Sequence, residues 1–210
     1  MAMERDRTVV AIIGHSYVSR LEMFASEHEH HNIRSDLNLR QCEVHWLGNR
    51  GGKVKKVLRY DLMAIDAIRP DVAIVHLGGN ELDNGDDPET VAASLVHLAG
   101  RLKDHGCQLV YLCSVLPRPR PKFSSQQQFQ TAADHFNDHL KIILDHRPGH
   151  KQDKEFQNIK FWQHRRFREN ELNVHDRDGV HLNDLGQKRL YYSIRQAAYE
   201  SDKRLRTLNN

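Results

Sequence analysis

The sequence predicts an α/β protein built on a doubly wound parallel sheet, and three observations lead to this fold class. Short apolar runs alternate along the chain with longer segments of helical periodicity, which is typical of a parallel sheet with helices on both faces. The apolar runs are continuous rather than alternating, as expected for strands that are buried on both sides. A glycine or polar cluster follows each run, at the edge where such sheets bind ligands. The expected architecture is therefore three-layered, α/β/α.

Five segments are predicted to be strands, and the first and third have the pattern of buried ones. The first, "RTVVAIIG", is a continuous apolar run that ends at Gly14. The third, "DVAIVHLGG", has the same composition, so its His76 is predicted to be a hydrogen-bonded core residue. The fifth, "NIKFWQ", is the weakest of the set. The predicted strands are residues 7–14, 42–48, 71–79, 107–117 and 158–163.

The segments between the strands are predicted to be helices, and the residues after Ser16 could open the first one. Residues 87–106 carry the clearest boundaries, since Asp87 is a suitable N-cap, Pro88 fits the first helical position and Gly106 can end the helix. The other predicted helices are residues 53–70, 124–146 and 183–201.

Length and composition indicate one domain over residues 1–210, with a core at about 7–201. The 210 residues contain no apolar run near the roughly 20 needed to span a bilayer. The N-terminus "MAMERDRTVV" lacks the pattern of a signal peptide. The three cysteines are odd in number and have no metal-ligand spacing. A cytoplasmic protein in a reducing compartment is expected.

The charge pattern makes nucleic acid a weakly supported partner. Lys and Arg number 31 against 28 Asp and Glu, a net charge of +3, which is too small to indicate nucleic-acid binding. Residues 164–170 and 202–210 are nevertheless locally basic. The stretch "EHEHH" at 27–31 places at most two imidazoles on one helical face without a third ligand. No metal and no cofactor is therefore expected.

The clusters that follow the strands contain the groups that acyl transfer requires, namely a nucleophile, a base, an orienting group and oxyanion donors. They read "GHS", "GNRGG", "GGNE", "PRPRP" and "DRDGVH" in strand order. Ser16 lies where a helix begins, so its N–H is available to an oxyanion. Asn80 follows two glycines and offers an amide NH₂. Asp178 lies three residues before His181 and could orient its ring.

Structural explanations for the same residues stay open. Ser16 could cap a helix, the paired glycines could form a tight turn, and Asn80 could stabilise a turn. Asp178 and His181 could cap the last helix, and Asp176 could replace Asp178 as the group that orients the ring.

The four short blocks "GHS" (14–16), "GNRGG" (48–52), "GGN" (78–80) and "DGVH" (178–181) together resemble those of the SGNH hydrolases, the GDSL-type esterases and lipases. The resemblance implies a flavodoxin-like sheet of five strands and hydrolysis of a carboxylic ester through an acyl-enzyme. It implies that Ser16 is the nucleophile, His181 the base and Asp178 its orienting group. The implied oxyanion donors are the Ser16 N–H, a glycine N–H, with Gly52 preferred over Gly51, and the Asn80 side chain.

The first block departs from the family pattern Gly-Asp-Ser, because His15 stands at its centre. His15 is expected to be a partly exposed turn residue that lowers activity or changes its pH dependence. His15, Gly51 and Arg118 are the candidates for substrate contact. The expected substrate is a small molecule or acyl ester with a short acyl or acetyl group.

A different class of function is kept as the alternative. The stretch "GHSYVSRL" also resembles esterase-like domains associated with retrotransposon first open reading frames. That resemblance implies a catalytically weakened binding module in nucleic-acid machinery. The oligomeric state and the identity of the ester cannot be derived from the sequence.

Overall fold

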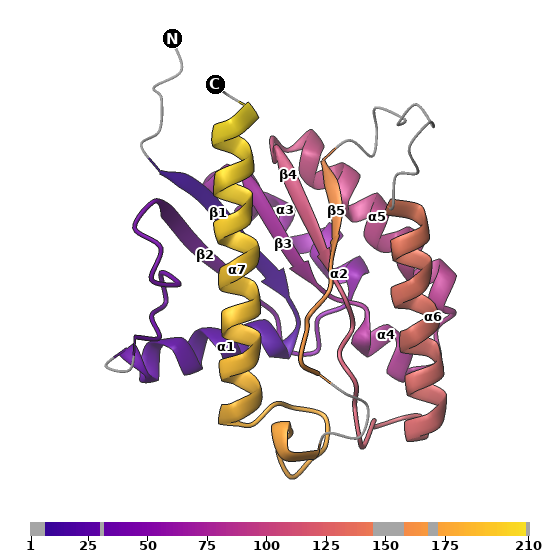
Figure 1. Ribbon diagram of the computed structural model, residues 1–210. Helices are drawn as coiled ribbons and strands as arrows, with labels where there is room; N and C mark the ends of the chain where they lie inside the picture. The colour runs from indigo at the N-terminus through magenta and orange to yellow at the C-terminus, as the bar shows by residue number, and fades with distance from the viewer. Residues whose placement is uncertain (1–6, 30–31, 145–157, 168–171, 209–210) are drawn as a thin grey trace.

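The computed structural model describes residues 7–29, 32–144, 158–167 and 172–208 and has three layers, α/β/α (Figure 1). Its sheet contains five strands in the order β2-β1-β3-β4-β5, and every pairing is parallel. This confirms the predicted fold class. The strands are β1 Thr8–Gly14, β2 Cys42–Gly48, β3 Val72–His76, β4 Leu109–Cys113 and β5 Ile159–Trp162.

Alternate side chains of the central strands enter two separate cores, one on each face of the sheet. In β1, Ala11 and Ile13 belong to one core, whereas Val10 and Ile12 belong to the other. Because both faces are apolar, these strands read as continuous apolar runs. All three cysteines are buried and none forms a disulfide.

The helices divide between the two faces. Residues of α1 and α7 pack in one core, in front of the sheet in Figure 1, and residues of α2, α3, α5 and α6 pack in the other. None of the described helices is long and apolar enough to cross a membrane. The helices are α1 Ser16–Glu27, α2 Val54–Tyr60, α3 Leu62–Ile68, α4 Gly79–Asp83, α5 Pro88–Asp104, α6 Gln126–Leu144 and α7 Asp184–Leu208, with a short 3₁₀ helix at Leu172–Val174.

Four predicted elements differ clearly from those observed. The strand predicted over 107–117 is shorter, at Leu109–Cys113, and the helix predicted over 183–201 continues to Leu208. The helix predicted over 53–70 is divided at Asp61, whose carboxylate accepts a hydrogen bond from Asn49 at 2.6 Å. The strand predicted over 71–79 ends at His76, because Gly78 has a φ of 103° that an extended strand does not allow. The short helix α4 begins immediately afterwards. The last two residues of the helix predicted over 124–146 lie outside the described residues.

Candidate active site

The candidate site lies at the carboxyl ends of the central strands, where α1 begins directly after β1. Gly14 pairs with Gly48 on one side and with His76 on the other. A Cβ at residue 14 would lie 2.5 Å from Val18 Cγ2 and 2.6 Å from the His76 carbonyl oxygen, and one at residue 48 would lie 2.4 Å from the Ser19 N. Only glycine at these two positions lets the first turn of α1 lie against the ends of the strands. That packing places Ser16 at the rim.

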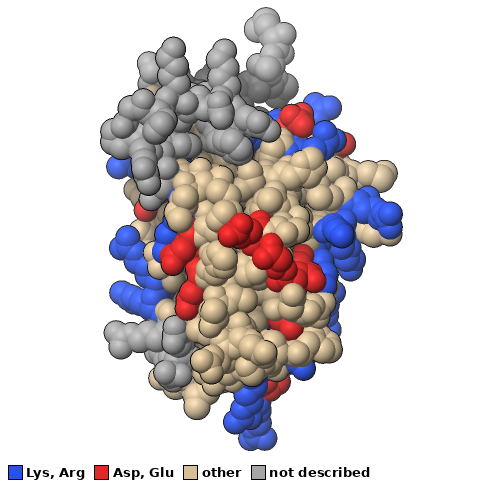
Figure 2. Space-filling model, turned by 90° about the vertical axis from the view of Figure 1, so that its right-hand side faces the viewer, with Lys and Arg blue, Asp and Glu red and all other residues tan. Residues whose placement is uncertain are grey.

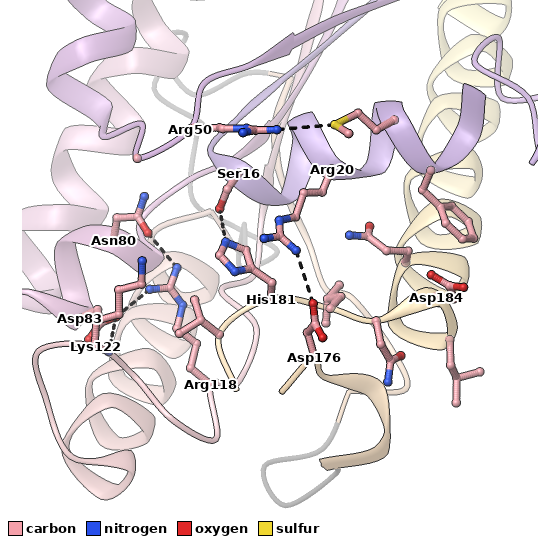
Figure 3. A pocket seen from close by; sticks show the side chains of 18 of the residues that line it. Ser16, Arg20, Arg50, Asn80, Asp83, Arg118, Lys122, Asp176, His181 and Asp184 are labelled. Atoms are coloured by element: carbon pink, nitrogen blue, oxygen red, sulfur yellow. Dashed lines mark hydrogen bonds and ion pairs between the residues drawn. The ribbon is translucent and has the colours of Figure 1, made fainter. Parts of the chain in front are cut away.

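Ser16, His181 and Asp178 form a continuous line of contacts. Ser16 Oγ lies 3.1 Å from His181 Nε2 (Figure 3), although the two residues are 165 positions apart. On the other side of the ring, His181 Nδ1 lies 2.5 Å from Asp178 Oδ2. A neutral His181 that donates from Nδ1 to the carboxylate presents a free electron pair at Nε2 to the serine hydroxyl. This is the arrangement that activation of a serine nucleophile requires.

Local hydrogen bonds orient the Asp178 carboxylate. Its Oδ1 accepts from the N–H groups of Val180 and His181 at 2.9 and 2.8 Å. Burial alone would raise the pKa of Asp178, but hydrogen bonds from the backbone and ring of His181 and from the Val180 N–H hold this pKa well below its usual value. Asp178 therefore stays ionised beside His181. Asp176, the alternative orienting group, instead faces Arg20 at 3.7 Å.

Asn80 is held by hydrogen bonds at both ends of its side-chain amide. Its Oδ1 accepts from Arg118 Nη2 at 2.9 Å, and its Nδ2 donates to the Gly52 carbonyl oxygen at 2.9 Å. A guanidinium only donates, so the amide oxygen has to face Arg118. An NH₂ group has two hydrogens, and the bond to Gly52 uses one of them. The other hydrogen is available to a ligand.

The other expected oxyanion donors have different surroundings. Ser16 is the first residue of α1, where a backbone N–H has no partner within the helix. The Gly52 N–H donates to the Asn49 carbonyl oxygen at 2.8 Å, so it is engaged in a turn, whereas Gly51 lines the cleft. The carboxylate of Glu81 supports this loop, since it accepts from the Val54 N–H at 2.6 Å and thereby caps α2.

These side chains open into a cleft of about 1180 Å³ between the ends of α1, α4 and α7. Ser16, Asn80 and His181 lie on its wall (Figure 3). The described residues contain no group of three or more His, Cys, Asp or Glu side chains placed to hold a metal ion, and His30 and His31 of the predicted histidine-rich stretch lie outside them. The cleft brings together a serine hydroxyl, an imidazole and hydrogen-bond donors, which are the groups that acyl transfer uses.

The expectation that His15 is partly exposed is wrong. His15 is 1% exposed, and its Nδ1 accepts from the Tyr17 N–H at 3.3 Å as the N-cap of α1. The ring does not line the cleft. An imidazole nitrogen serves as the helix cap here, because it can accept a backbone hydrogen bond as the usual oxygen caps do.

His15 begins a row of three buried rings behind Ser16. The His15 and His76 ring centroids are 5.2 Å apart, and His76 stacks on His164 at 5.0 Å. His76 is buried as predicted, but neither of its ring nitrogens has a hydrogen-bond partner within the described structure, contrary to expectation. Burial lowers the pKa of His76 to about 4, and it holds the pKa values of His15 and His164 well below the usual value.

Because these three rings are buried, we expect the free energy of unfolding to fall in mild acid. The unfolded chain takes up protons on the three histidines below about pH 6.5, whereas the folded chain does not, so the free energy of unfolding decreases as pH falls. A His76 pKa near 4 corresponds to a loss of about 2 kcal/mol between pH 7.5 and pH 5. Urea unfolding across this range measures the effect.

The substitution His76→Phe should reduce this pH dependence, because phenylalanine fills the site without a titrating group. The exposed His97 of α5 supplies the matched control, and His97→Gln should leave the slope unchanged. Equal slopes in the wild type and His76→Phe would contradict the prediction.

The contact between Arg118 and Asp83 was not predicted from the sequence. Arg118, predicted to touch substrate, lines the cleft but is 3% exposed and pairs with Asp83 at 3.0 Å. No sequence pattern links Asp83, at the end of α4, to Arg118, which lies 35 positions later in the loop after β4. The proline-rich cluster "PRPRP" indicated only that this loop lies at the carboxyl edge of the sheet, where such folds bind ligands.

An α/β/α sheet with a serine, a histidine and an aspartate in contact at its carboxyl edge is typical of α/β serine hydrolases. Residues 14–189 match the sequence profile of the GDSL-like Lipase/Acylhydrolase family. The chain belongs to this family, which confirms the resemblance to the SGNH hydrolases and supports a hydrolase.

Solved structures with the same fold include several esterases. A GDSL-like lipase from Bacteroides thetaiotaomicron is 15% identical, with a TM-score of 0.66 over 92% of this chain and 89% of that one. A family 3 carbohydrate esterase from Clostridium thermocellum is 15% identical, with a TM-score of 0.64 over 95% and 98%. An acetyl xylan esterase is 17% identical, with a TM-score of 0.63 over 90% and 98%. The comparison with curated proteins gave no match.

Proposed function

We propose that this chain is a serine esterase that hydrolyses a carboxylic ester with a short acyl group through an acyl-enzyme. The observation that carries the proposal is the line of contacts from Ser16 Oγ through the His181 ring to the Asp178 carboxylate. If Ser16 served only as a helix cap, its hydroxyl would not need His181 beside it. His181 would then also not need the ionised Asp178 at its other ring nitrogen.

The proposed reaction has two halves. His181 Nε2 takes the Ser16 proton as Oγ attacks the acyl carbon, and the imidazolium then protonates the leaving alcohol as its C–O bond breaks. A water molecule next gives a proton to His181 and attacks the acyl carbon of the acyl-enzyme. His181 returns this proton to Ser16 Oγ as the acyl–Oγ bond breaks, which releases the acid and restores the serine. Asp178 stays ionised and stabilises the imidazolium in both halves.

The oxyanion that forms at each tetrahedral stage needs preorganised donors. We propose the Ser16 N–H and the second amide hydrogen of Asn80 for this role. A backbone N–H of the 48–52 loop completes the set. Gly52 remains the proposed residue, although its N–H donates to Asn49 in the structure, so it would have to share or exchange this bond when substrate binds.

The acetyl group is the first acyl group to test. Two of the proteins with the same fold are named for acetyl esters, the acetyl xylan esterase and an acetyl esterase with bound acetate. A series of p-nitrophenyl esters from acetate to octanoate, assayed between pH 5 and pH 9, tests the reaction and ranks the acyl length. An organophosphonate probe followed by mass spectrometry tests whether Ser16 becomes covalently labelled. An unlabelled chain without turnover would overturn the proposal.

Asn80→Ala should lower kcat roughly 10²–10³-fold, the usual effect of removing one oxyanion donor. The expected KM changes little, because the lost hydrogen bond matters most in the transition state. Asn173→Ala is a suitable control, since Asn173 is exposed and does not line the cleft. An unchanged kcat in Asn80→Ala would contradict the role of the amide.

The alternative, a nucleic-acid-binding module with weakened catalysis, is derived from the sequence alone. On the face that carries α5 and α6, acidic side chains lie across the middle and the Lys and Arg side chains lie mainly toward the edges (Figure 2). Phosphate backbones require concentrated positive charge, and the visible part of this face does not present it. The candidate site keeps its serine, histidine and aspartate in contact, which favours the esterase.

A further inference from the structure

The strongest unexplained feature of the site is a buried ion pair beneath Asn80. The Arg118 and Asp83 side chains are each 3% exposed, and Arg118 Nη1 donates to Asp83 Oδ2 at 3.0 Å. Asp83 also accepts from the backbone N–H groups of Lys122 and Phe123, both at 3.0 Å. These bonds tie the end of α4 to the loop that follows β4, and they fix the plane of the guanidinium.

The second arm of the guanidinium reaches the active site. Arg118 Nη2 donates to Asn80 Oδ1 at 2.9 Å (Figure 3). The Arg118 Nε has no hydrogen-bond partner among the described residues, and the guanidinium carbon lies 5.3 Å from the Phe129 ring centroid and 5.9 Å from that of Tyr17. The aromatic walls and Asp83 leave the guanidinium one orientation, in which one Nη faces Asp83 and the other faces Asn80.

Stability alone does not account for this arrangement. A buried ion pair is often no more stabilising than apolar residues of similar volume, because both charges lose their hydration. A lysine could also satisfy Asp83 as a point charge. Its single ammonium would have to serve both Asp83 and Asn80 from one nitrogen, whereas the planar fork of arginine faces each of them with a separate Nη. The contact with Asn80 is therefore the property that favours arginine.

We propose that Arg118 is a positioning residue for the oxyanion donor, with Asp83 holding Arg118 in place. Arg118 fixes the amide oxygen of Asn80, so that the NH₂ faces Gly52 and the catalytic cleft. The positive charge behind the amide also polarises its N–H bonds, which strengthens the bond to a developing oxyanion. This inference rests on the proposed function, and it replaces the expectation that Arg118 binds substrate.

Arg118→Lys is the central test, because it keeps a positive charge beside Asp83 but replaces the two fixed Nη donors with one flexible ammonium. We expect kcat to fall roughly 10- to 100-fold, no further than in Asn80→Ala, with KM little changed. In the Asn80→Ala background, Arg118→Lys should cause no further loss. The exposed Arg101 of α5 supplies the matched control, since Arg101→Lys should leave kcat unchanged.

Two kinetic results would overturn the proposal. An equal loss of kcat in the presence and absence of the Asn80 amide would mean that Arg118 acts independently of it. A raised KM with unchanged kcat would mean that Arg118 binds substrate. Circular dichroism and thermal melting establish that each variant folds, and Asp83→Asn, which removes the partner charge instead, should lower kcat in the same way.

An NMR measurement tests the positioning without any turnover. The side-chain NH₂ signals of Asn80, assigned by their absence from the ¹H–¹⁵N spectrum of Asn80→Ala, should be displaced from those of a solvated amide in the wild type. They should move toward the solvated values in Arg118→Lys. Unchanged signals would overturn the positioning role. Absence of esterase activity with displaced signals would overturn the proposed function and leave the positioning supported.

Discussion

Replacing Ser16 with alanine is expected to reduce kcat roughly 10⁶-fold. The substitution removes the Oγ that lies 3.1 Å from His181 Nε2 and would form the acyl bond. Removal of the nucleophile of a catalytic triad causes losses of this size, because the remaining groups cannot form the covalent intermediate. Ester turnover and labelling by the organophosphonate probe should disappear together.

Ser26→Ala is the matched control for this experiment. Ser26 lies on α1 like Ser16, but it is exposed and its Oγ donates to the Glu22 carbonyl oxygen in the preceding turn. Its removal should leave turnover and labelling unchanged. Ser16→Ala should keep the circular dichroism and melting temperature of the wild type, since α1 is capped by His15 rather than by Ser16. Turnover that persists in a folded Ser16→Ala would refute the assigned nucleophile.

The second large effect is expected from Asp178→Asn, which should reduce kcat roughly 10⁴-fold. The asparagine amide carries no negative charge, so it is a weaker acceptor for the His181 Nδ1–H. If its NH₂ group faces Nδ1 instead, it favours the imidazole tautomer whose Nε2 carries the proton. That tautomer cannot accept the Ser16 proton. The imidazolium also loses the ionised carboxylate that stabilises it.

Asp176→Asn distinguishes the two aspartates that the sequence left as alternatives. Asp176 faces Arg20 and accepts from the Arg177 N–H, away from the His181 ring. Its substitution should change kcat less than tenfold. A larger loss in Asp176→Asn than in Asp178→Asn would mean that the orienting group has been assigned to the wrong residue. Steady-state kinetics of both variants across pH 5 to 9 provide the comparison.

The predictable part of the fold is the part that local chemistry controls. Continuous apolar runs indicated the three central strands β1, β3 and β4, because a strand buried on both faces excludes polar residues along its whole length. The edge strands β2 and β5 are partly exposed and gave a weaker signal. Asp87 and Pro88 indicated the start of α5 correctly, since the side chain of Asp87 accepts from the Thr90 N–H as an N-cap does. The end of β3 and the division at Asp61 were not predictable, because a glycine conformation and the contact with Asn49 decide them.

The candidate site also has a part that the sequence predicted and a part that only the tertiary structure decided. The order of strands and the clusters that follow them placed Ser16, Asn80, Asp178 and His181 at one edge, because parallel strands share their carboxyl ends. The tertiary structure decided which atoms meet. It brought the Arg118 guanidinium to Asp83 and Asn80, and it buried His15 next to Ser16. Composition and periodicity determine which face or edge a residue occupies, whereas hydrogen-bond partners from distant loops depend on packing that only the folded chain defines.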